Sequence, residues 1–236
     1  MYNTILTISI IVYALMLTGL LTVAGNSALK EKHYVKVKML TSGGFIVAAY
    51  IFGYLGQNQD ELLHLLPALA GCFIGDYFMG LYNRSRKKRF MGLGIGFFML
   101  AHIGFLWYLY WLDNSIVIWD YLLPVVVILL TYLLVYVAHL HLGKIRPAVG
   151  IYSAFVTAFM VKAVHFMLVN KGSMGFTSYG VMTGVAGILF FTSDFSLLFL
   201  YFYHFHNKKC EKAIHIYNLF SYYVAVFLIG LTLAVM

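Results

Sequence analysis

Apolar runs long enough to cross a lipid bilayer recur along almost the whole chain. A transmembrane helix needs about 20 mainly apolar residues to cross roughly 30 Å of hydrocarbon. Hydropathy and helix breakers define eight such runs, at residues 4–24, 39–55, 62–82, 90–111, 120–140, 147–169, 177–204 and 214–235. The runs are continuous rather than alternating, which excludes a transmembrane β-barrel. We therefore predict an all-α integral membrane protein, with residues 1–236 forming a single bundle of eight transmembrane helices.

The composition leaves little material for a domain outside the membrane. Charged residues make up 10% of the chain, against about 25% in soluble domains. The first run has no basic segment before it and no clear cleavage site, so we interpret it as a retained helix rather than a signal peptide. The chain is short and lacks retention signals, and we expect a multi-pass protein of a bacterial cytoplasmic membrane.

Basic residues are concentrated in every second loop. The loops after the first, third, fifth and seventh runs hold fourteen of the sixteen lysines and arginines, namely Lys30, Lys32, Lys36, Lys38, Arg84, Arg86, Lys87, Lys88, Arg89, Lys144, Arg146, Lys208, Lys209 and Lys212. The positive-inside rule places these loops in the cytoplasm and both termini on the other side. The net charge of +8 is explained by this topology, so we expect membrane lipids and no nucleic acid as partners.

Two aspartates inside the runs are the strongest indication of function. Asp76 and Asp194 lie in the third and seventh runs, where no nearby residue in the sequence neutralises them. An ionisable group at membrane depth costs about 2.5–3.5 kcal/mol and marks a functional site or a buried partner. At 1.5 Å per residue from the cytoplasmic ends, Asp76 lies roughly 10 Å deep, Asp194 roughly 15 Å and His102 roughly 18 Å. We favour a functional pair of acids over two packing contacts.

Two weaker patterns lie near the predicted cytoplasmic surface. His206 and Cys210 have the i,i+4 spacing of two ligands on one helical face, but the spacing is not a recognised zinc pattern. We therefore expect no metal and no other cofactor. The basic run from Arg84 to Arg89 is chiefly a topology signal, and its second interpretation is that Arg84 and Arg89 hold a lipid phosphate above the acids.

Several stretches carry a resemblance to a known family. They are GDYFMGL (75–81), RFMGLGIGFFMLAHIGFL (89–106), RPAVGIYSAFVTAFM (146–160), AGILFFTSDFSLLF (186–199) and SYYVAVFLIG (221–230). In order and spacing they resemble the signatures of the YhhN-type lysoplasmalogenases, which are polytopic membrane hydrolases. The resemblance covers the chain from the third run onward.

The resemblance implies particular site residues and a reaction. It makes Asp76 and Asp194 the principal acids, with His102 and Tyr223 as neighbours, and Tyr152 is a further candidate for orienting substrate or water. The family often has Gln shortly after the tyrosine pair, where this chain has Val226. If that Gln contacts substrate, Asn218 has to replace it, or the headgroup preference differs.

The implied reaction is hydrolysis of the vinyl-ether bond of a lysoplasmalogen to a fatty aldehyde and a glycerophospho-headgroup. Protonation of the β-carbon creates an oxocarbenium ion, water adds, and the hemiacetal collapses. One carboxyl has to be protonated and the other ionised, as in glycosidases, and we favour Asp194 as the acid because it lies deeper. The alternatives are a proton- or cation-coupled transporter, which broken helices beside both acids would indicate, and a non-catalytic lipid-binding protein.

Overall fold

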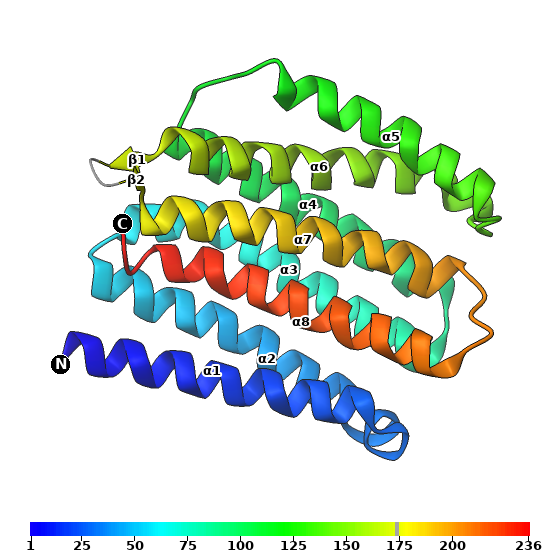
Figure 1. Cartoon of the computed structure of the whole chain (residues 1–236). Helices are drawn as coiled ribbons and strands as arrows, with labels where there is room; N and C mark the ends of the chain where they lie inside the picture. The colour runs from blue at the N-terminus through cyan, green and yellow to red at the C-terminus, as the bar shows by residue number, and fades with distance from the viewer. Residues whose placement is uncertain (173–174) are drawn as a thin grey trace.

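Eight long α-helices form most of the structure, a computed structural model that describes residues 1–172 and 175–236 (Figure 1). They are α1 (Tyr2–Gly25), α2 (Ser27–Gly56), α3 (Gln59–Ser85), α4 (Lys88–Leu112), α5 (Trp119–Val137), α6 (Arg146–Val169), α7 (Ser178–Phe202) and α8 (Lys208–Thr232). Each is long and apolar enough to cross a membrane. The prediction of an all-α protein with eight candidate membrane spans is thus confirmed.

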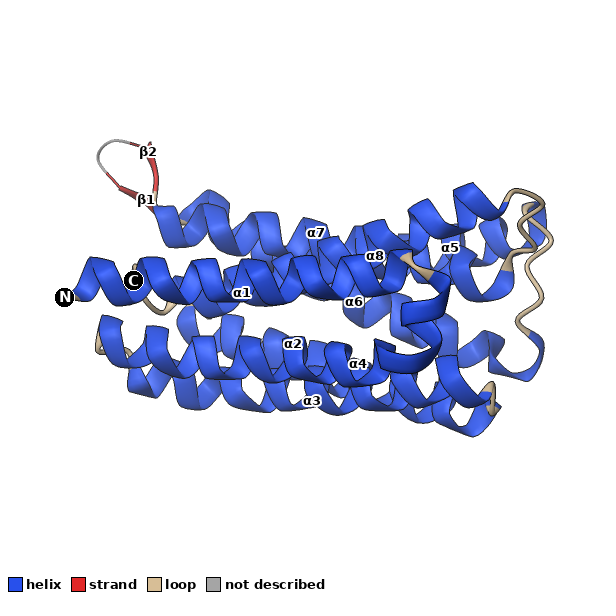
Figure 2. Cartoon of the chain, turned by 90° about the horizontal axis from the view of Figure 1, so that it is seen from below, coloured by secondary structure: helices blue, strands red, loops and turns tan. Residues whose placement is uncertain are grey.

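The connections between the helices are short. A single 3-10 turn, η1 (Gly143–Ile145), precedes α6. Two antiparallel strands, β1 (Lys171–Gly172) and β2 (Gly175–Phe176), join α6 to α7, with Lys171 paired to Phe176. This hairpin lies at the same end of the bundle as both termini (Figure 2). We call the opposite end, where α1–α2, α3–α4, α5–α6 and α7–α8 are joined, the basic end.

The helix bounds differ most from the sequence prediction at α2, which begins at Ser27 rather than at residue 39. The side chain of Asn26 accepts hydrogen bonds from the backbone N–H groups of Ala28 and Leu29, which caps the new start. Lysine is a good helix former, so this lysine-rich segment continues the helix. Lys38 therefore lies within a helix that packs against the rest of the bundle, and not in a loop as predicted.

The last helix occupies a central place in the bundle. Helices that follow each other in the sequence pack together, except for α4 and α5. In addition, α8 packs against α1 and α2, and α6 packs against α4. Figure 1 shows α1 and α5 at the two edges of the bundle. The chain thus returns at its end to insert α8 between α2 and α7, which lie far apart in the sequence.

Large apolar side chains cover much of the outer surface of the bundle. Leu15, Leu40, Leu63 and Leu129 are each more than 60% exposed, and soluble proteins rarely expose apolar patches on this scale. This apolar outer surface is suited to contact with lipid tails, as expected of a multi-pass integral membrane protein.

Two glycines set a close approach between α3 and α4. A Cβ atom on Gly71 would lie 3.0 Å from the backbone of Ala101, and one on Gly104 would lie 2.9 Å from the backbone nitrogen of Ala68. Small residues at these positions let the two backbones approach closely. The contact fixes α3, which carries Asp76, against the part of α4 that carries His102.

Candidate functional site

Asp76 is fully buried and receives four polar contacts from two other helices. Lys38 of α2 forms an ion pair with Oδ1. Ser42, one turn further along α2, donates to Oδ2 at 2.6 Å. From α8, Tyr222 and Tyr223 donate to Oδ2 at 2.9 and 3.2 Å. All four partners are donors, and an ionised carboxylate accepts such bonds with both oxygens.

The ion pair corrects the expectation that nothing neutralises Asp76. Lys38 is only 5% exposed, and its ammonium also lies 3.4 Å from the hydroxyl oxygen of Tyr223. The sequence did not indicate that Lys38 pairs with Asp76, because Lys38 is the last of four lysines that precede an apolar run and was assigned to a basic loop. Its i,i+4 spacing to Ser42 was the available signal, since that spacing places both side chains on one helical face.

Asp194 has a different environment and no cation beside it among the described residues. Tyr152 of α6 donates a 2.8 Å hydrogen bond to Oδ2. Nε2 of His102 lies 3.4 Å from the same oxygen without the alignment of a hydrogen bond. The other ring nitrogen, Nδ1, lies 2.7 Å from the carbonyl oxygen of Phe98, and it can only donate to that oxygen. In a neutral imidazole, Nε2 therefore carries a lone pair that faces the carboxyl of Asp194.

The two acids line one small cavity between α2, α3, α7 and α8. Its volume is about 30 Å³, which is enough for one or two water molecules. Lys38, Asn218 and Tyr222 also line it. Asp76 lies nine residues before the end of α3, and Asp194 lies eight before the end of α7. Both are thus about 12–14 Å from the basic end at 1.5 Å per residue, in keeping with the shared level predicted from the sequence.

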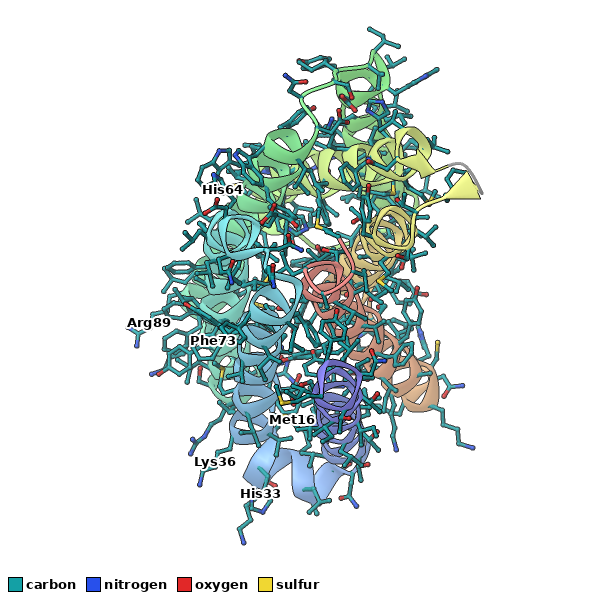
Figure 3. All side chains as sticks on the ribbon, turned by 90° about the vertical axis from the view of Figure 1, so that its left-hand side faces the viewer. Met16, His33, Lys36, His64, Phe73 and Arg89 are labelled. Atoms are coloured by element: carbon teal, nitrogen blue, oxygen red, sulfur yellow. The ribbon has the colours of Figure 1, made fainter. Side chains whose placement is uncertain are left out.

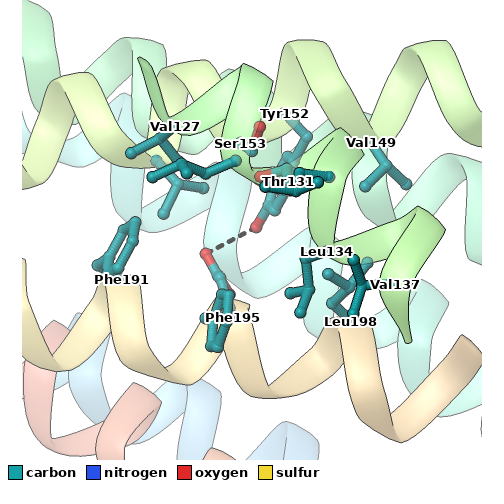
Figure 4. A pocket seen from close by; sticks show the side chains of 14 residues that line it. Val127, Thr131, Leu134, Val137, Val149, Tyr152, Ser153, Phe191, Phe195 and Leu198 are labelled. Atoms are coloured by element: carbon teal, nitrogen blue, oxygen red, sulfur yellow. Dashed lines mark hydrogen bonds between the residues drawn. The ribbon is translucent and has the colours of Figure 1, made fainter. Parts of the chain in front are cut away.

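A larger apolar cleft opens on the other side of Asp194, between α5, α6 and α7 (Figure 4). Its volume is about 470 Å³, within the range of roughly 300–1,000 Å³ typical of ligand sites. Val127, Leu134 and Phe191 are among its walls, and Asp194 and Tyr152 line it too. The dashed line in Figure 4 marks the bond between these two residues. The carboxyl of Asp194 is thus shared by a polar cavity and an apolar cleft.

The structure places the remaining predicted residues as follows. Asn218 of α8 lines the cavity, and its amide donates to the backbone oxygen and the hydroxyl of Ser193 at 2.9 Å each. It therefore ties α8 to α7 beside Asp194. Arg84 lines a surface cleft at the basic end. Arg89 points outward from α4 (Figure 3), with its guanidinium 4.8 Å from the ring centre of Phe90. Neither arginine lines the cavity of the two acids.

The surface histidines and cysteine do not assemble into a metal site. The rings of His204 and His206 lie 5.8 Å apart, and Cys210 is exposed. Within residues 1–172 and 175–236, no group of three or more His, Cys, Asp or Glu side chains could hold a metal ion.

A second buried lysine escaped the sequence analysis. Lys162 of α6 is fully buried near the end of the bundle that carries the termini. Its ammonium lies 3.1 Å from Oδ2 of Asp113 and 2.6 Å from the backbone oxygen of Ser115. Burial raises the pKa of Asp113, but hydrogen bonds from Ser115 and Lys162 outweigh it, so that the pKa lies below its ordinary value. This pair anchors the α4–α5 connection to α6, away from the two acids.

Comparison with known proteins gives one match. The sequence model of the YhhN family matches residues 34–233, which is most of the chain. No curated protein and no solved structure matches it significantly. The matched range includes all the residues around Asp76 and Asp194 described above, Lys38 among them.

Proposed function

Since the chain belongs to the YhhN family, we propose that it is a membrane hydrolase that cleaves the vinyl-ether bond of lysoplasmalogens. One observation carries this proposal. Two buried carboxyls line a single cavity, and their partners differ: Asp76 has a lysine and three hydroxyl groups, whereas Asp194 has one tyrosine and one imidazole. Environments that separate the protonation states of two carboxyls are the basis of acid catalysis through a carbocation.

Asp194 is the proton donor in this proposal. Nε2 of His102, which carries a free lone pair, lies 3.4 Å from Oδ2 of Asp194. A carboxylate and a lone pair at this distance repel each other, and a single proton on either group removes the repulsion. We therefore assign one proton to the pair of Asp194 and His102, while the hydroxyl of Tyr152 keeps the carboxyl oriented.

Asp76 is the ionised partner. The ammonium of Lys38 and the hydroxyl donors of Ser42, Tyr222 and Tyr223 satisfy both oxygens of a carboxylate, and the positive charge of Lys38 favours its ionised form. Its negative charge stabilises a cation that forms in the adjoining cavity. The hydroxyl groups also provide hydrogen-bond partners for a water molecule there.

The reaction then follows in three steps. Asp194 transfers its proton to the β-carbon of the vinyl ether, and the ether oxygen shares the resulting positive charge with the α-carbon as an oxocarbenium ion. Water adds to the α-carbon and gives a proton back to the carboxylate of Asp194. The hemiacetal so formed collapses to a fatty aldehyde and a glycerophospho-alcohol, with the alcohol oxygen taking up the hemiacetal proton.

The apolar cleft suits the hydrocarbon chain of such a substrate. It reaches Asp194 from the side of α5, which packs chiefly against α6. A chain lying there would bring the vinyl-ether end to Asp194 and Tyr152. In contrast, α3 and α7 run unbroken through Asp76 and Asp194, so the broken helices expected for the alternative transporter do not occur beside either acid.

The test uses the purified protein in detergent with a 1-alkenyl lysophospholipid, and free aldehyde is measured. Asp76→Asn and Asp194→Asn should each lower the rate by at least about 100-fold. Asp113→Asn is the matched control, because it also removes the carboxylate of a lysine–aspartate pair but lies outside the cavity. In D₂O, the aldehyde should carry one deuterium on the carbon next to the carbonyl. Full activity in either cavity variant, or no aldehyde from the wild-type protein, would overturn the proposal.

A further inference from the structure

Several positively charged side chains line a cleft at the basic end, beside the cavity of the two acids. The cleft lies between α2, α3, α7 and α8 and has a volume of about 340 Å³. Lys30, Arg86, Lys208 and Lys212 line it, together with a single acid, Glu211. These cations come from three different helices or their ends, so the fold and not one run of basic sequence brings them together.

Three of these cations have no ion pair among the described residues. Glu211 is 3.4 Å from Lys208 and accounts for that lysine. The ammonium of Lys30 lies instead 3.5 Å from Nδ1 of the buried His215, which is a ring nitrogen and not a carboxylate. A basic surface that only directs topology needs no common cleft. Cations that outnumber the acids lining one cleft attract an anion to it.

The cleft adjoins the cavity of the acids. Asn83, Tyr201 and His215 line both spaces. The hydroxyl of Tyr201 donates to the side-chain oxygen of Asn83 at 3.2 Å and so links α7 to α3 at this boundary. Nε2 of His215 lies 3.4 Å from the hydroxyl of Tyr34, which also lines the cavity. A molecule whose anionic group binds in the cleft would therefore lie next to the two acids.

From this geometry we propose that Lys30, Arg86 and Lys212 bind the phosphate of the lysolipid headgroup. The proposal rests on the proposed function for the identity of the attached chain. Arginine and lysine are the side chains that bind phosphate most effectively, through charge-assisted hydrogen bonds. The phosphate contact then lies in the cleft that adjoins the cavity, and not at Arg84 and Arg89 as expected from the sequence. The substrate then has its phosphate at the basic end, its vinyl ether between the acids and its chain in the apolar cleft.

Binding is tested without turnover by using a saturated ether lipid, 1-alkyl-glycerophosphoethanolamine, which has no vinyl-ether bond. The wild-type protein in detergent should bind this lipid more tightly than 1-alkylglycerol, which lacks phosphate. Lys30→Met, Arg86→Gln and Lys212→Met should each weaken binding of the phospholipid about 5- to 10-fold and leave binding of 1-alkylglycerol unchanged. Lys87→Gln is the matched control, since it removes a neighbouring charge that does not line the cleft.

Further measurements distinguish the possible outcomes. Competition by inorganic phosphate alone, with no preference between the two lipids, would show a site for free phosphate and refute the headgroup assignment. Equal binding of both lipids by all variants would also refute it. If the wild-type protein does not cleave the 1-alkenyl lysophospholipid yet prefers the saturated phospholipid over 1-alkylglycerol, the proposed function fails and the phosphate site stands.

Discussion

Removing the ammonium of Lys38 should destabilise the protein strongly. In Lys38→Met, Asp76 keeps its three hydroxyl donors but loses its cation in a fully buried position. Breaking a buried ion pair in this way costs about 3–5 kcal/mol, because it leaves an uncompensated charge in the interior.

This free energy corresponds to a measurable loss of melting temperature. A chain of this length loses about 2–4 °C of Tm per kcal/mol. The expected loss for Lys38→Met relative to the wild-type protein is therefore about 6–20 °C.

Thermal unfolding in detergent at pH 7 measures this difference. The double variant with Lys38→Met and Asp76→Asn is the key comparison, because it removes both charges and leaves a neutral amide among the same hydroxyl groups. It should recover most of the Tm lost by Lys38→Met. An unchanged Tm in Lys38→Met, or a double variant no more stable than the single one, would refute a buried charge pair.

Three further predictions concern the surroundings of the site. Tyr152→Phe should lower the rate of aldehyde release about 10-fold without a large loss of Tm, because Asp194 loses its one orienting hydroxyl; an unchanged rate would contradict that role. Gly104→Ala should lower Tm, since the new methyl group meets the backbone of α3, whereas Gly92→Ala, which meets nothing within 4 Å, should raise it slightly. The lowered pKa of Asp113 means that its ion pair stabilises the fold above the ordinary aspartate pKa and loses this effect as the pH falls through the folded-state pKa, below about 4. Asp113→Asn should therefore lower Tm more at pH 6 than at pH 3, and an equal effect at both would contradict the ion pair.

Much of the fold could be predicted from the sequence, because it depends on properties that act along one dimension. Eight apolar runs predicted eight helices, since any backbone in hydrocarbon has to satisfy its own hydrogen bonds. The bounds were less predictable, as α2 shows: Lys38 is charged, so hydropathy assigned it to a loop, yet its segment is helical from Ser27. Charge alone does not reveal whether a lysine at the end of an apolar run faces water or a buried acid.

The same distinction applies to the candidate site. The similar depth of Asp76 and Asp194 could be predicted from the sequence, because depth follows from distance along a helix. Their partners could not be predicted, since these depend on the order and rotation of the helices in the folded bundle. The insertion of α8 between α2 and α7 brings Tyr222, 146 residues away in the sequence, to Asp76. The same packing puts Lys38 beside one acid and His102 beside the other, so that two identical carboxyls acquire different electrostatic surroundings.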